Sequence, residues 1–269
     1  MTVLIESGYT LPSGDYPLTH SRIAHSENWL SGGTAAASTT ATDFDADAPL
    51  NSLTYELWQP TSLGATWAYD HGSAVECDYA VIAAHTLGSN GCTIKVQYST
   101  NNSSWSDLTA ATAIADDSPI FAIFEPVTAR YWRINITTGS DEPTIGVIKF
   151  GAALQMPRPI YGGHAPISMA RQTILRSNYS ETGEFLGRTK QRTYGSTGFS
   201  WQNLPADWVH TNWPEMQRAI ETEPFFVAWR PSDYDDVAFG QVDQVPVPSN
   251  QGVRDLMSVE LSIRTRGYD

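Results

Sequence analysis

The sequence predicts a mainly β protein: an antiparallel β-sandwich followed by a second β-rich domain with one helix. In Thr-Ile-Lys-Val-Gln-Tyr-Ser at residues 93–99, apolar side chains fall on alternate positions, as in a strand with one buried face. Residues 131–136 repeat this pattern with large aromatic side chains, which suit a pleated sheet. The polar segments 88–91 and 100–104 are rich in Gly, Asn and Ser, and they supply the turns between strands.

The predicted sandwich contains closely spaced short strands, which is typical of antiparallel architectures. We place them at residues 77–84, 92–99, 120–124, 130–136 and 145–150. Both cysteines, Cys77 and Cys92, fall in this stretch. They could bridge neighbouring strands or remain buried thiols. The first residues lack the basic start and apolar core of a signal peptide, so we expect no export by the usual route and favour free thiols.

Composition and charge also indicate two domains. The chain has 269 residues, of which 41% are hydrophobic, enough to bury a core in each domain. Residues 1–150 carry 5 Lys and Arg against 16 Asp and Glu, whereas residues 151–269 carry 11 against 13. The acidic first half argues against nucleic acid as a partner. No segment approaches the roughly 20 apolar residues of a membrane span, so we expect no membrane insertion.

The charge boundary near Gly151 and a segment rich in Pro and Gly divide the chain into four parts. The predicted parts are an N-terminal strand in residues 1–19 that could join the C-terminal domain, the sandwich at 20–155, a linker at 156–166 and a C-terminal domain at 167–269.

The C-terminal domain is expected to start with a long hairpin, with strands at residues 168–177 and 184–199. A helical pattern follows from about residue 208 and is clearest at 213–223. Pro214 is placed in its first turn, and Pro224 ends it. A short buried strand at 225–229 and an alternating strand at 258–265 complete the domain.

No motif in the sequence indicates catalysis, so we expect no enzyme activity, cofactor or bound metal. The six histidines form no close metal pair, the cysteines lack zinc-ligand spacing, and neither a Gly-x-Ser-x-Gly elbow nor a phosphate-binding Gly-rich loop is present. Asp43, Asp45 and Asp47 could ligate a hard cation. However, Ala48 and Thr54 replace the Gly and Glu that an EF-hand requires, which favours a solvated acidic loop. Two carboxylates meeting in space for glycoside hydrolysis stay an open alternative.

Residues 20–155 resemble a discoidin domain, the coagulation-factor C-type, galactose-binding-like jelly roll. The matching segments are Leu-Thr-Tyr-Glu-Leu-Trp-Gln-Pro at 53–60, Trp-Ala-Tyr-Asp at 67–70, the strand at 93–99 with its polar turn and Trp105, Ala-Arg-Tyr-Trp-Arg-Ile at 129–134 and Ile-Gly-Val-Ile-Lys-Phe-Gly at 145–151. These segments describe core and turns, so the resemblance implies a jelly-roll fold more than a ligand.

Residues 160–269 resemble tail-tip proteins of long-tailed bacteriophages, with the ring-forming distal tail family as the nearest comparison. The resemblance rests on the order of hairpin, helix, Phe-Phe-Val-Ala-Trp-Arg-Pro at 225–231 and a final Val-x-Leu-x-Ile-x-x-Arg-like strand. It departs from that family's arrangement, in which the ring-forming domain comes first.

The resemblances imply a structural component of a phage virion, made in the host cytoplasm and located at the tail tip. Its expected partners are copies of itself in a ring, the tail tube and hub proteins, and a host-surface glycan bound by the jelly roll. The alternative is a non-catalytic carbohydrate-binding module of a larger surface or secreted system.

Candidate site residues follow from these two hypotheses. The candidates for glycan binding are Trp29, Trp67, Trp105, Asp70, His71 and His85. Structural alternatives are core packing for Trp67 and Trp105, a satisfied buried histidine for His85, and a buried Asp–Arg pair for Asp70 with Arg133. The candidates for an assembly interface on the hairpin are Arg171, Arg176, Arg188, Lys190 and Arg192, with a solvated hairpin as the alternative.

Overall fold

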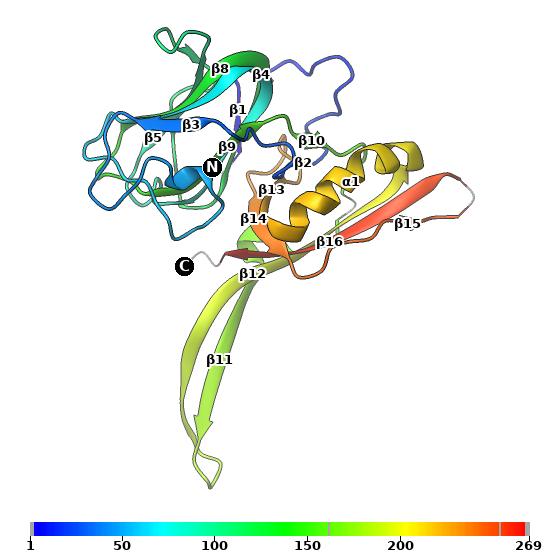
Figure 1. Cartoon of the computed structure of the whole chain (residues 1–269). Helices are drawn as coiled ribbons and strands as arrows, with labels where there is room; N and C mark the ends of the chain where they lie inside the picture. The colour runs from blue at the N-terminus through cyan, green and yellow to red at the C-terminus, as the bar shows by residue number, and fades with distance from the viewer. Residues whose placement is uncertain (1–2, 161, 253, 267–269) are drawn as a thin grey trace.

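The computed structural model describes residues 3–160, 162–252 and 254–266, which form two eight-stranded sheets, one α-helix and two short 3-10 turns (Figure 1). The elements are β1 (Val3–Ile5), β2 (Arg22–Ala24), β3 (Thr34–Ala37), a 3-10 turn (Ala48–Leu50), β4 (Thr66–His85), β5 (Thr93–Ser99), β6 (Ser106–Asp107), β7 (Thr112–Ala113), β8 (Ile120–Thr138), β9 (Ile145–Gly151), β10 (Leu154–Gln155), a 3-10 turn (Ile167–Met169), β11 (Arg171–Tyr179), β12 (Phe185–Pro205), α1 (Ala206–Thr222), β13 (Phe225–Ala228), β14 (Val237–Val242), β15 (Ser249–Asn250) and β16 (Leu256–Arg266). Within the described ranges, no helix is long and apolar enough to cross a bilayer.

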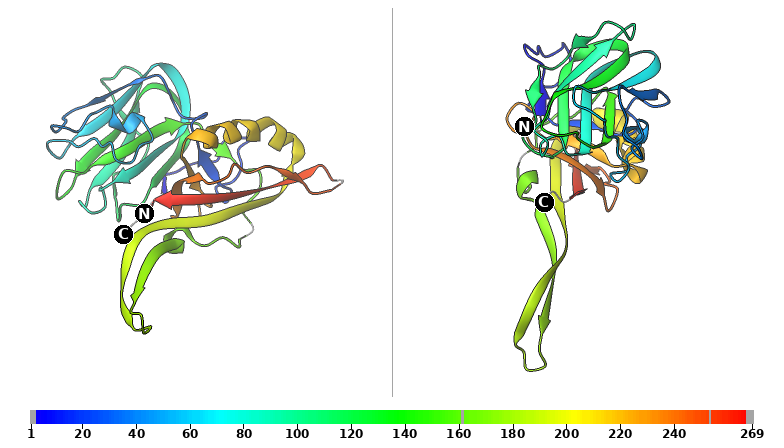
Figure 2. Two further views of the ribbon diagram at one scale, coloured as in Figure 1. Left: turned by 60° about the horizontal axis from the view of Figure 1, so that its bottom comes forward. Right: turned by 90° about the vertical axis from the view of Figure 1, so that its left-hand side faces the viewer.

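The first sheet folds into a sandwich because its two longest strands bend and enter both layers. β4 and β8 are antiparallel, with register irregularities that follow Asp70 and Cys77. The first part of β4 pairs with β3 and with the last part of β8, which also pairs with β5. The second part of β4 pairs with β9, and β1 pairs with the first part of β8 (Figure 2). The mainly β, jelly-roll prediction is confirmed.

The second sheet runs in the order β10-β2-β13-β14-β16-β12-β11 and carries α1 across one face (Figure 1). Trp213, Met216 and Ile220 of α1 share one buried cluster with strand residues Trp201 and Val259. The prediction of a second β-rich unit with one helix therefore agrees with the structure.

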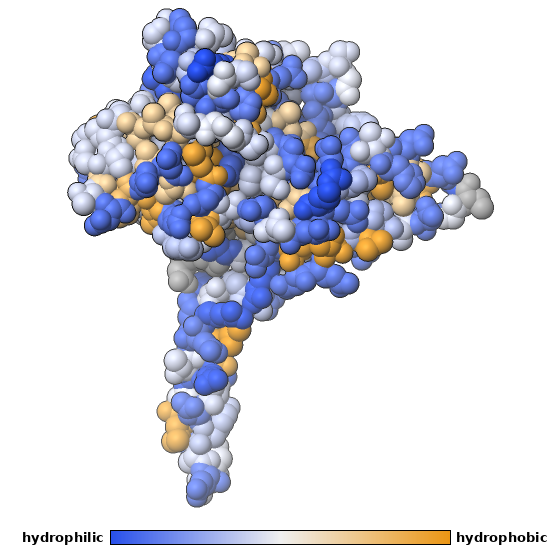
Figure 3. All heavy atoms as spheres, viewed as in Figure 1, coloured by the Kyte–Doolittle hydropathy of each residue, from blue (hydrophilic) through white to orange (hydrophobic). Residues whose placement is uncertain are grey.

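A long hairpin projects from this second sheet, away from the rest of the chain (Figures 1 and 2). We call residues 171–193 the arm. β11 and the first part of β12 pair with each other from Arg171 to Phe185, whereas β12 begins to pair with β16 only at Tyr194. Gly183 at the tip has a φ of 87°, which favours glycine. The surface of the arm is mainly hydrophilic, with isolated apolar residues (Figure 3).

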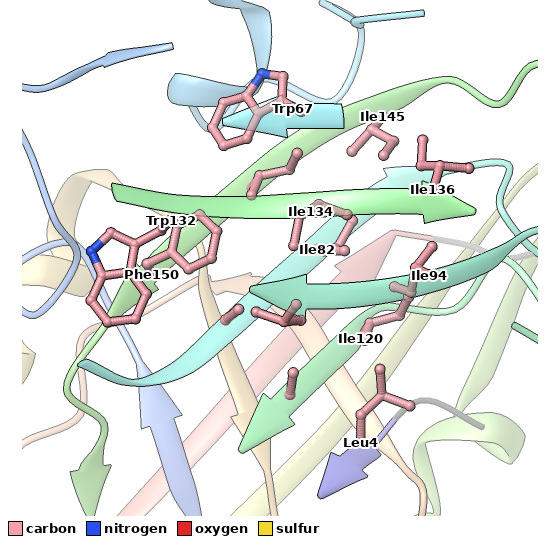
Figure 4. Packing of buried hydrophobic residues seen from close by; sticks show 14 of the residues in the cluster. Leu4, Trp67, Ile82, Ile94, Ile120, Trp132, Ile134, Ile136, Ile145 and Phe150 are labelled. Atoms are coloured by element: carbon pink, nitrogen blue, oxygen red, sulfur yellow. The ribbon is translucent and has the colours of Figure 1, made fainter. Parts of the chain in front are cut away.

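The sandwich interior is an aromatic and aliphatic core between the two layers (Figure 4). Trp132 packs on other aromatic rings of this core, with its ring centroid 6.2 Å from that of Phe124 and 6.0 Å from that of Phe150. Ile82, Ile134 and further isoleucines on β5, β8 and β9 belong to the same buried cluster.

A separate apolar cluster joins the two sheets face to face. Val81 and Phe121, on the outer face of the sandwich, share this cluster with Phe226 and Phe239 of the second sheet. The rings of Phe226 and Phe239 are 4.4 Å apart. The two units are therefore connected through a buried core and not only through a linker.

The structure corrects three expectations about chain path. A strand from residues 1–19 does not join the C-terminal unit, because β1 pairs in parallel with β8. Instead β2 crosses over and pairs with β13 and β10. The predicted linker at 156–166 is partly packed, since Met156 and Ile160 are buried in the second core.

The third correction concerns the helix, which begins at Ala206 and not near residue 213. Pro214 therefore lies inside α1, where it removes one backbone N–H donor. Thr211 and Asn212 donate side-chain hydrogen bonds to the carbonyls of Asp207 and Trp208, which adds local bonds in the preceding turn.

The shared apolar cluster predicts cooperative unfolding of both units. Phe226→Ala should lower the free energy of unfolding by roughly 3–5 kcal/mol, because it removes a buried aromatic ring. Val247→Ala, at a position 78% exposed, is the control. Tryptophan fluorescence and circular dichroism in denaturant should give coincident transitions for both variants. Two separate transitions, with only one moved by Phe226→Ala, would contradict a joint core.

Candidate functional site

The strongest candidate for a binding site is a groove of about 530 Å³ where one edge of the sandwich meets the end of α1. Its walls come from the loop before β3, the loop after the first 3-10 turn, strands β4 and β9, and Glu223 directly after α1. The residues that line it are Ser26, Trp29, Leu30, Ser31, Gly32, Gly33, Leu50, Asn51, Ser52, Leu53, Trp67, Tyr69, Ile148, Lys149, Phe150 and Glu223.

Trp29 and Lys149 contact each other in the lining of this groove. The Lys149 ammonium lies 4.9 Å from the centroid of the Trp29 ring, within the range of a cation–π contact. Lys149 also donates a hydrogen bond to the carbonyl of Leu50. Backbone pairing of Trp29 with Gly151 at the end of β9 fixes the position of the indole. The indole N–H of Trp29 is buried and has no hydrogen-bond partner among the described residues.

Lys149 is a buried cation in an otherwise apolar strand. Its side chain is only 8% exposed, and burial lowers the pKa of Lys149 to about 8, while the nearby Glu223 carboxylate opposes that shift. Within the part of the chain that the structure describes, no carboxylate lies within ion-pair distance of its ammonium. Lys149 therefore keeps donor capacity for a ligand in the groove.

Tyr69 adds a polar group to the same wall. Its hydroxyl accepts a hydrogen bond from the Gly33 backbone N–H at 3.0 Å and keeps its own proton available for donation. Burial raises the pKa of Tyr69, so the hydroxyl stays protonated at neutral pH. Asn51 donates to Glu56, and its side-chain oxygen accepts from the Leu53 backbone, which holds the opposite loop in place.

Of the sequence candidates, both Trp29 and Trp67 line the groove, but Trp29 is half-buried and Trp67 is fully buried. Trp67 exposes 0% of its surface and donates its indole N–H to the Ala46 carbonyl at 2.7 Å. A side chain without exposed surface cannot stack on a ligand, so the proposal of Trp67 as a ligand-stacking residue is wrong. Its core alternative agrees with the structure.

His85 is also a structural residue. It is buried, its Nε2 lies 2.8 Å from the Ser118 carbonyl, and its Nδ1 accepts from the Leu87 backbone N–H. Burial lowers the pKa of His85 to about 4, so the ring is neutral at physiological pH. With both ring nitrogens engaged, His85 has no capacity left for a ligand.

The remaining ligand candidates lie outside the groove lining. Asp70 forms a bidentate ion pair with Arg130, at 2.7 and 2.9 Å, and not with Arg133 as expected. That hydrogen-bonded pairing holds the pKa of Asp70 below its ordinary value. Arg133 instead lies 4.1 Å from the ring centroid of half-buried Trp105. His71 follows Asp70 at the β4 irregularity, with its ring 6.2 Å from that of Tyr69.

The five candidates for an assembly interface all lie on the arm, as the hairpin prediction expects, and all are exposed. They are Arg171, Arg176, Arg188, Lys190 and Arg192.

Cys77 and Cys92 are free buried thiols. Burial raises the pKa of both, which makes them unreactive at neutral pH. Within the described ranges, no group of three or more His, Cys, Asp or Glu side chains could hold a metal ion.

Lys149 and Glu223 were missed by the sequence analysis. Lys149 carries a signal, because it is the one charged residue in the apolar strand Ile-Gly-Val-Ile-Lys-Phe-Gly. Glu223 has no comparable signal in the sequence, because its place in the groove lining depends on how the two units pack against each other.

Comparisons with known proteins find similar folds but no family. No protein-family model matches the chain, and no curated protein matches it. A chitosan-binding module 1 from a chitosanase/glucanase of Paenibacillus sp. IK-5 is 17% identical, covers 46% of this chain and 97% of its own, and has a TM-score of 0.41. CBM32 of AlyQ, in complex with 4,5-unsaturated mannuronic acid, is 17% identical over 45% of this chain and 96% of its own, with a TM-score of 0.42. CBM32-1 from a family 31 glycoside hydrolase of Clostridium perfringens is 10% identical over 46% and 96%, with a TM-score of 0.41.

The buried charge of Lys149 predicts a pH-dependent effect on stability. The unfolded lysine keeps its proton up to a pKa near 10.5, whereas the folded one releases it near 8. Between these values the unfolded state binds more protons, so this group makes the protein more stable as pH rises. Lys149→Met should therefore stabilise the chain at pH 7 and lose much of that gain at pH 10.

Denaturant titrations at both pH values measure this difference. Lys95→Met, at a half-buried lysine that pairs with Asp107 and is 28% exposed, serves as the comparison for loss of a lysine that stays in contact with solvent. An equal effect of Lys149→Met at pH 7 and pH 10 would contradict the burial of its charge.

Proposed function

We propose that this chain is a non-catalytic saccharide-binding protein, and that the groove at Trp29 is its binding site. The observation that carries the proposal is the combination of an aromatic face, Trp29, with the ammonium of Lys149 and the hydroxyl of Tyr69 in one concave site. A sugar ring offers an apolar C–H face for stacking and hydroxyl groups for hydrogen bonds, so it matches this set.

The presence of one carboxylate among the described lining residues favours binding over hydrolysis. Glycoside hydrolysis typically uses two carboxyl groups placed on either side of the scissile bond. Among the described residues that line the groove, Glu223 is the one carboxylate. Glu223 is therefore assigned to hydrogen bonding with sugar hydroxyls.

Replacement of Trp29 tests this proposal. A glycan array identifies saccharides that bind the whole chain, and calorimetry then gives the affinity for the strongest one. Trp29→Ala should weaken that affinity about tenfold or more, because it removes the stacking surface. Trp105→Ala is the matched control, since Trp105 packs on Arg133 outside the groove lining and should leave affinity unchanged.

Two results would count against the groove. The first is a wild-type chain that binds no saccharide on the array. The second is a Trp29→Ala variant that binds its saccharide as tightly as wild type while Trp105→Ala weakens binding.

A second candidate function is a structural subunit of a phage tail tip, forming a ring together with tail tube and hub proteins in the virion. The specific observation that favours an assembly role is the arm, because a projecting hairpin reaches beyond the subunit that carries it (Figure 1). Negative-stain images of the concentrated protein test this candidate. Closed rings of uniform size are the expected result, and single particles at every concentration would exclude ring formation by the chain alone.

A further inference from the structure

The arm has an exposed surface that the chain itself does not cover. Tyr179, Phe185 and Leu186 near its tip are 59%, 57% and 66% exposed. The rings of Tyr179 and Phe185 contact each other at 5.8 Å, and no other ring contacts either of them among the described residues. An isolated two-stranded hairpin is at best marginally stable in water. A hairpin with apolar side chains at its tip is therefore suited to pack against another molecule.

The arm is also basic, in a chain that is strongly acidic. It carries five Lys and Arg against two Asp and Glu, whereas the whole chain has a net charge of −13. Arg188 donates to the Ser177 hydroxyl, and Arg192 lies near the Tyr194 ring. For the part of the chain that the structure describes, no carboxylate forms an ion pair with Arg176, Arg188 or Arg192.

The sandwich carries a surface of the opposite kind. A hollow of about 440 Å³ is lined by four carboxylate residues, Asp43, Asp45, Asp47 and Glu56. Tyr55 in the same lining is 74% exposed. No Lys or Arg side chain in residues 3–160, 162–252 or 254–266 forms an ion pair with the three aspartates.

We propose that the arm of one chain docks on the acidic hollow of a second copy of this chain. The two surfaces have complementary charge. The arm presents arginines together with aromatic and aliphatic side chains, and the hollow presents carboxylates together with an exposed tyrosine. The arm points away from the sandwich of its own chain, so the contact is between molecules (Figures 1 and 2).

This contact is head-to-tail, because the arm and the hollow are different surfaces. A bound pair therefore still has one free arm and one free hollow, and repetition of the contact generates a closed ring or an open chain of subunits. The inference does not depend on saccharide binding, because the groove at Trp29 and the hollow have only Asn51 in common.

Charge reversal on each surface provides the test. One variant carries Arg176→Glu, Arg188→Glu and Arg192→Glu, and the other carries Asp43→Lys, Asp45→Lys and Asp47→Lys. Arg171 and Lys190 are left unchanged because they already have interaction partners. The control carries Arg158→Glu, Arg218→Glu and Arg254→Glu, which changes net charge as the reversed-arm variant does, but at exposed sites off the arm. Circular dichroism melting checks that every variant is folded.

Sedimentation velocity of the full chain over a range of concentrations measures association. We expect wild type and control to associate, and 1 M salt to weaken that association by screening. Each reversed variant alone should stay monomeric, and an equimolar mixture should associate again, because both contacts regain opposite charges. A monomeric wild type would overturn the proposal. So would a reversed-arm or reversed-hollow variant that associates like wild type, or folded variants whose mixture stays monomeric.

Discussion

The contact between two apolar sheet faces is the constraint on which the rest of the structure depends. Phe121 and Val81 leave the sandwich with a second buried face, and Phe226 and Phe239 cover it. Burial of this surface is favourable by the hydrophobic effect, and it fixes the two units relative to each other. That fixed arrangement brings Glu223, which follows α1, to the wall of a groove built mainly by the sandwich.

This arrangement separates the two surfaces that we associate with function. The groove lies at the seam between the units, where side chains are held by neighbouring strands and loops. The arm lies outside both cores, so its side chains contribute little to the stability of the fold. A chain built in this way can bind a ligand at one surface and a further protein at the other without either contact disturbing the cores. The two proposed activities are therefore physically independent.

Local patterns in the sequence predicted the fold class well. Residues 258–265 have one buried face, and alternation indicated the strands at 93–99 and 258–265 correctly, although Gln97 and Ser99 on the opposite face of β5 are buried as well. The same patterns could not show that β4 and β8 bend into both layers. Alternation indicates which side chains of a strand are buried, but not which strands pair with it or pack against it. β9 is buried along its whole length, so it has no alternation to read. The predicted helix start was too late because proline prefers the first turn of a helix. In the structure Pro214 lies inside α1, since packing of Trp213 and Met216 in the second core outweighs that preference.

The candidate site was predicted only in part, for a related reason. Trp29 and Trp67 both line the groove, but Trp29 is half-buried whereas Trp67 is fully enclosed, a distinction that only the fold makes. The most direct test of the account is a crystal structure of the whole chain soaked with a saccharide that binds it in solution. We expect a sugar ring packed on Trp29, within reach of Lys149 and Glu223. A saccharide bound only elsewhere, for example beside Trp105, would contradict it.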